Sequence, residues 1–91
     1  MQIEARNHGC TINLTVSKST IILVFTIGRK TFKHEFQEFN RREIIDVILS
    51  QTESLMYRFP SAKVLQVANT FINVFAMCKY EQVQAKQEIS A

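Results

Sequence analysis

The chain has 91 residues, of which 46% are hydrophobic and 21% charged, with two glycines and one proline. This composition excludes a disordered chain and predicts one domain over residues 1–91, with flexible ends at residues 1–8 and 87–91. The net charge of +3 is a mild basic excess, below that of a dedicated nucleic-acid-binding chain. Without an apolar leader or a run long enough to cross a bilayer, the sequence predicts a cytoplasmic protein without membrane association.

The first predicted strand covers residues 10–16, CTINLTV. Ile12, Leu14 and Val16 alternate there with polar side chains. A period of two residues is typical of a strand with one buried face.

The next two predicted strands, residues 20–27 and 30–36, form a hairpin. Gly28 and Arg29 separate them, and the glycine supplies the positive φ of a type II′ turn. A two-residue turn fixes the register and places three residue pairs on one face. These pairs are Phe25 with Phe32, Leu23 with His34, and Ile21 with Phe36.

Apolar residues then recur every three to four positions, which indicates two helices. Asn40 and Glu43 form a capping box at the start of the first helix, and Pro60 ends it. Ser61 is predicted to cap the second helix, which continues to about residue 86. The sequence therefore predicts an α+β fold, in which a three-stranded antiparallel meander precedes two helices packed on one sheet face.

No residue pattern in the sequence indicates a metal site or a catalytic pair. His8, Cys10, His34 and Cys78 follow no paired-ligand spacing, so we predict no metal and no cofactor, and the cysteines are expected to be reduced, buried thiols. His34 and Glu35 are adjacent strand residues whose side chains point to opposite faces, so they do not converge as an acid and a base. We predict a protein that is not an enzyme.

Basic residues gather at the two ends of the predicted sheet. They form either a solvated rim or a surface that binds phosphate groups of nucleic acid. The candidate residues are Arg6, Arg29, Lys30 and Lys33 at one end, and Lys18, Arg41 and Arg42 at the other.

The second helix has an apolar arc that covers more than half of its circumference, wider than one sheet face requires. Either this helix is wedged between the sheet and the first helix, or a second chain covers it. The second hypothesis assigns an interface to Val67, Thr70, Val74 and Met77.

These observations favour a small, non-enzymatic, intracellular binding protein. We expect a homodimer that acts as a regulator or inhibitor by binding a macromolecular partner, an unidentified protein. Compact chains with an interaction surface and no catalytic site are typical of phage or mobile-element accessory proteins. The alternative is an RNA- or DNA-binding module that uses the two basic ends.

Overall fold

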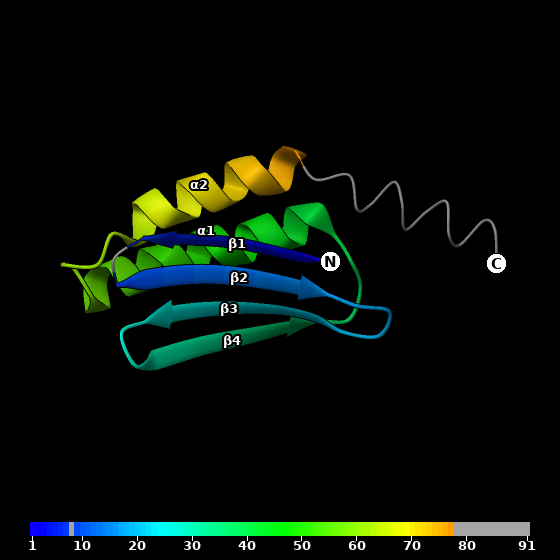
Figure 1. The fold of residues 1–91 in the computed structure, drawn as a ribbon, viewed down its shortest axis with the longest axis horizontal. Coiled ribbons are helices and arrows are strands. Elements are labelled where there is room, and N and C mark those ends of the chain that lie inside the picture. The colour runs from blue at the N-terminus through cyan, green and yellow to red at the C-terminus, as the bar shows by residue number, and fades with distance from the viewer. Residues whose placement is uncertain (8, 78–91) are drawn as a thin grey trace.

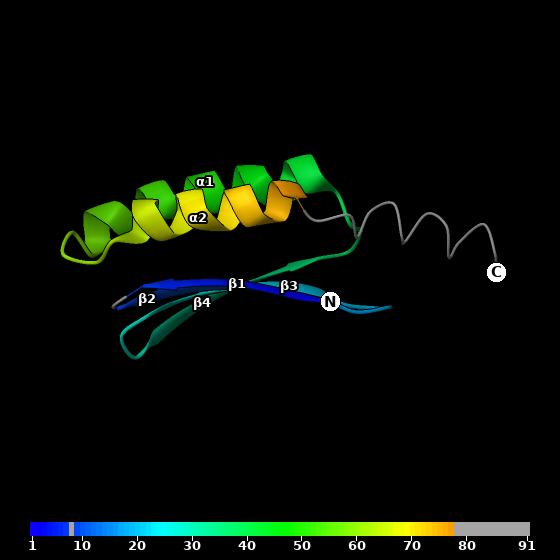
Figure 2. The same cartoon turned by 45° about the horizontal axis from the view of Figure 1, so that its top comes forward.

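The computed structural model describes residues 1–7 and 9–77, which form one layer of strands and one layer of helices (Figure 1). The strands form an antiparallel sheet in the order β1-β2-β3-β4, and both helices cover the same face of it (Figure 2). The α+β class and the helices on one face are therefore confirmed. The elements are β1 (Gln2–Asn7), β2 (Cys10–Val16), β3 (Ile21–Ile27), β4 (Lys30–Phe36), α1 (Arg41–Arg58) and α2 (Val64–Met77).

The prediction of three strands is wrong, because residues 2–7 form a fourth strand, β1, at the edge of the sheet. Its inward residues, Ile3 and Ala5, are buried against the helices. The α-amino group of Met1 also donates a hydrogen bond to the Val16 carbonyl at 2.8 Å, which ties the start of the chain to β2. The segment expected to be flexible at the start of the chain thus includes β1, and residues 8 and 87–91 lie outside the described residues.

The predicted β3–β4 hairpin is confirmed in register: Phe25 pairs with Phe32, and the neighbouring pairs follow as expected. Gly28 has a φ of +60°, whereas no non-glycine residue in the described part of the chain has a positive φ. This combination fits a type II′ turn, in which only the first central residue needs positive φ. Gly9, at the β1–β2 turn, also has positive φ.

The helix boundaries agree with the sequence at α1 and differ at α2. The Asn40 side chain accepts a hydrogen bond from the Glu43 N–H at 3.0 Å, so the predicted cap of α1 is confirmed. The predicted cap of the second helix at Ser61 is wrong, because residues 59–62 form a turn, closed by a bond from Ala62 N–H to the Phe59 carbonyl, and α2 begins at Val64. The predicted continuation to residue 86 lies beyond the described residues.

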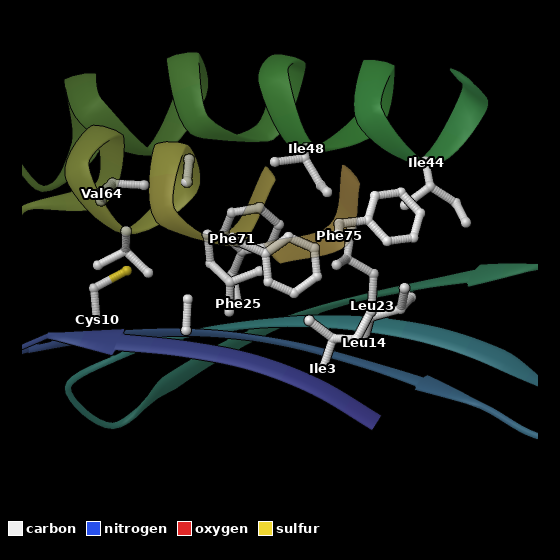
Figure 3. Packing of buried hydrophobic residues seen from close by; sticks show 14 of the residues in the cluster. Ile3, Cys10, Leu14, Leu23, Phe25, Ile44, Ile48, Val64, Phe71 and Phe75 are labelled. Carbon is white, nitrogen blue, oxygen red and sulfur yellow. The ribbon is translucent and has the colours of Figure 1, made fainter. Parts of the chain in front are cut away.

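The core lies between the sheet and α2, which contacts β1, β2 and α1. Phe71 and Phe75 of α2 point into this core, and so does Phe25 of β3 (Figure 3). Ile44 and Ile48 of α1 are also buried in it.

Strand β4 is the least covered strand of the sheet. Only Phe36 is buried along it, while Phe32 is half-buried and His34 is exposed. A small hollow lies between β4 and α1, with Val47 and Gln51 on the helix side. The inward face of β4 is therefore only partly removed from water.

Because the helices cover β3 more fully than β4, replacing Phe25 or Phe32 with alanine should lower the free energy of unfolding by different amounts. Phe25→Ala should lower the free energy of unfolding by about 3 to 5 kcal/mol, because it empties a site that is 1% exposed. Phe32→Ala should cost about half as much or less, because its ring already touches water. Urea unfolding of both variants measures this, with Tyr57→Ala on the helix surface as a control. Equal losses of unfolding free energy in the two variants would show that the helices cover β4 to the same extent as β3.

A second prediction concerns Thr52 of α1, whose hydroxyl oxygen is buried and has no hydrogen-bond partner among the described residues. An unpaired buried hydroxyl costs about 1 to 3 kcal/mol. Thr52→Val keeps the shape and removes that cost, so it should raise the free energy of unfolding by about 1 kcal/mol. A loss of stability in the same urea titration would mean that the hydroxyl has a partner in solution.

Candidate functional site

One side of α2 faces away from α1 and lies along β1. Gln66 marks this side, because its side-chain oxygen accepts a hydrogen bond from the Asn7 side chain of β1 at 3.2 Å. Thr70, Val74 and Met77 follow at helical spacing on the same side. We call these three residues the α2 flank. Val74 is 45% exposed and Met77 is 81% exposed, so the flank presents apolar surface to solvent.

Val67 does not belong to this surface. Its side chain is only 2% exposed and packs into the core between α2 and the sheet. The expectation that Val67 lacks cover within the chain is therefore wrong, because its side chain belongs to the hydrophobic core. The other three predicted interface residues are exposed, as a contact with another molecule requires.

Among the described residues, strand β1, beside the α2 flank, is an open edge of the sheet. Met1 and Val16 exchange two backbone hydrogen bonds, each of 2.8 Å, and the β1–β2 register continues without a bulge. Because bonded residues alternate in an antiparallel pair, the backbone groups of Gln2, Glu4 and Arg6 point away from β2. Such an edge can pair with another strand.

The basic end at the β3–β4 turn contains residues that the sequence analysis missed. The Arg58 guanidinium, at the end of α1, lies 5.1 Å from the ring centroid of Phe32 and 5.5 Å from that of Phe59. The Lys30 ammonium lies 5.7 Å from the Phe59 centroid. We call these four residues the cation–aromatic cluster. In the sequence, the adjacent residues Arg58 and Phe59 at the end of a predicted helix could have indicated this cluster. Only the fold shows that they contact Phe32 of β4.

The other predicted basic residues have different surroundings. Arg29 is exposed in the turn, and Lys33 pairs with Glu35 at 3.5 Å. Arg6 forms an ion pair with Glu4 at 2.9 Å. This pair lies near the same end of the sheet, because the Gly28 N–H in the β3–β4 turn donates a hydrogen bond to the Gly9 carbonyl in the β1–β2 turn.

At the opposite end, the three predicted cations differ in their surroundings. Lys18 and Arg42 are exposed, whereas Arg41 is half-buried. The Arg41 guanidinium lies 4.7 Å from the centroid of the Phe75 ring and donates a hydrogen bond to the Phe75 carbonyl. Arg41 therefore joins the start of α1 to the end of α2.

A second apolar surface lies on the outer side of the helix pair, away from the sheet. Leu49 and Met56 of α1 and Leu65 of α2 are each between 41% and 49% exposed. Met56 and Leu65 also line an open hollow at the corner between the helices, together with Pro60 and Lys63.

Of the four predicted metal candidates, Cys10 and His34 lie within the described residues. Within residues 1–7 and 9–77, no three His, Cys, Asp or Glu side chains could hold a metal ion. Cys10 is buried and burial raises the pKa of its thiol, whereas His34 is exposed beside Phe36. His8 and Cys78 lie outside the described residues.

Comparison of the chain with protein-family models, curated proteins and solved structures gives no match. Among the described residues, neither helix combines the length and hydropathy needed to cross a membrane.

Proposed function

We propose that this chain is a small, non-enzymatic binding protein that works as a homodimer and regulates or inhibits a macromolecular partner. The observation that carries the proposal is the position of the α2 flank beside the open edge of β1. Apolar side chains lie there next to backbone groups that have no partner strand within residues 1–7 and 9–77. Both features lower the free energy of association when a second molecule covers them.

A second copy of the chain is the partner that fits this surface best. An isologous contact brings the same patch together from both copies, so the flank need only complement itself. Thr70 and Gln66 are uncharged, and they can be covered without the desolvation cost of a buried charge. The outer helix surface around Leu49 then stays free in both copies for the regulated partner.

Val74→Glu tests the dimer. A carboxylate on the α2 flank should convert a wild-type dimer into a folded monomer, because Val74 is 45% exposed and tolerates a charge within one chain. Leu49→Glu is the matched control, since Leu49 is 49% exposed on the outer helix surface. It should leave the dimer intact.

Multi-angle light scattering at micromolar concentration, with circular dichroism to confirm folding, measures both variants. A wild-type mass of one chain would reject the homodimer. Dissociation by Leu49→Glu and not by Val74→Glu would move the interface to the outer helix surface.

RNA or DNA binding is the second candidate, and the cation–aromatic cluster favours it. Lys30 and Arg58 extend over aromatic rings at one end of the molecule, with Arg29 in the adjacent turn. No Asp or Glu occurs in residues 24–34 or 54–64, which include the β3–β4 turn and the end of α1, and the nearby Glu4 is paired with Arg6. Phosphate groups are the ligands that such a cluster of cations attracts.

The paired substitution Lys30→Glu with Arg58→Glu tests this candidate. It should weaken binding of a fluorescent single-stranded oligonucleotide by about tenfold or more at low salt and reduce the salt dependence of binding. Lys18→Glu with Arg42→Glu, at the opposite end, carries the same change of charge and should have a smaller effect. Absence of binding by the wild-type protein to RNA and DNA at low salt would reject this candidate.

A further inference from the structure

The outward face of β1 carries one acidic and one basic side chain, Glu4 and Arg6, next to each other on the same side of the strand. Their side chains are 38% and 72% exposed, and they form an ion pair at 2.9 Å. The same two residues direct their backbone N–H and C=O groups toward the open edge. The edge therefore presents hydrogen-bonding groups and a pair of opposite charges together.

An antiparallel contact between two β1 edges has few registers. The backbone groups that face outward belong to even-numbered residues, so these must pair with each other. If Glu4 faced Glu4 of the other copy, two like charges would be opposed. A shift by one residue in each copy places Glu4 opposite Arg6 and Arg6 opposite Glu4, with Ala5 at the two-fold axis.

We propose that two copies of the chain pair their β1 strands edge to edge, antiparallel, with Glu4 of each copy opposite Arg6 of the other. This inference rests on the homodimer proposed above and specifies how it forms. The two sheets become one continuous sheet, and the two α2 flanks come together over the junction. Val74 and Met77 are then covered by the same association that satisfies the edge.

The other edge strand, β4, is less suited to this contact although it carries a similar charge pair. Lys33 and Glu35 are 3.5 Å apart there, and their backbone groups also point outward because Ile27 and Lys30 flank a two-residue turn. On its helix side, however, β4 has exposed His34 and a hollow in front of α1. Pairing at β4 would bring no apolar flank with it.

Charge reversal at the two β1 positions tests the register. Glu4→Arg and Arg6→Glu, each alone, oppose like charges twice across the two-fold axis, so each should raise the dimer dissociation constant about tenfold or more. Glu4→Arg combined with Arg6→Glu in one chain restores both pairs and should restore the dimer. Mixing the two single variants should give a heterodimer, because both of its cross-strand pairs are again complementary.

The β4 variants Lys33→Glu and Glu35→Lys are the matched controls and should leave the dimer unchanged. Sedimentation equilibrium measures the dissociation constants, and thermal melts confirm that every variant is folded. Amide hydrogen exchange gives a second readout. The Glu4 and Arg6 amides should be protected in the wild type and should exchange fast in the Val74→Glu monomer, while the Lys33 amide exchanges fast in both.

The possible outcomes separate the two proposals. A dimer that Val74→Glu dissociates, but that neither single β1 variant weakens, keeps the homodimer and rejects edge pairing. Weakening by the β4 variants instead would assign the contact to the opposite edge. A wild-type monomer, or one that pairs only with added peptides of extended conformation, rejects both proposals.

Discussion

The sheet has one strongly apolar face, and covering that face with α2 is the constraint on which the rest of the structure depends. Strands β1, β2 and β3 all direct their buried residues toward the helices, so water must be excluded from a wide surface. Helix α2 covers the β1–β2 half directly, through Phe71 and Phe75. Its apolar arc is wide because it meets the sheet on one side and α1 on another. At the edge of this arc, Val74 remains outside the core.

The position of α2 makes the two edges of the sheet unlike. On the β1 side, a helix lies along the edge strand and extends apolar surface next to it. On the β4 side, α1 leaves Phe32 half-buried, and the Arg58 guanidinium lies over that ring instead of an apolar side chain. A cation over an aromatic ring contributes about 0.5 to 1 kcal/mol at an exposed site, so it is a weak cover that stays hydrated. The two edges thus differ in chemistry, because exposed apolar side chains accompany β1 and cations over aromatic rings accompany β4.

The dimer that we propose at β1 would leave several surfaces free for the macromolecular partner that we also propose. The outer helix surface with Leu49, Met56 and Leu65 faces away from the sheet in each copy. The uncovered sheet face, with a row of Thr11, Thr26 and Thr31 across three strands, also stays accessible. Two identical surfaces in one assembly raise the apparent affinity for a partner that presents two matching sites.

The sequence by itself determined the elements with strong local signals. Alternation in residues 10–16 and the two-residue turn at Gly28 defined three strands and the register of the last two, because side chains on a strand repeat every two residues. The capping box at Asn40 defined the start of α1. Only the tertiary structure decided that residues 2–7 form a strand, since Ile3 and Ala5 give too short an alternation to stand out. The tertiary structure also decided that Val67 is buried and Val74 is not, because helical periodicity gives the width of an apolar arc but not which neighbours cover it. The meeting of Arg58 with Phe32 likewise depended on long-range packing, which no local pattern encodes.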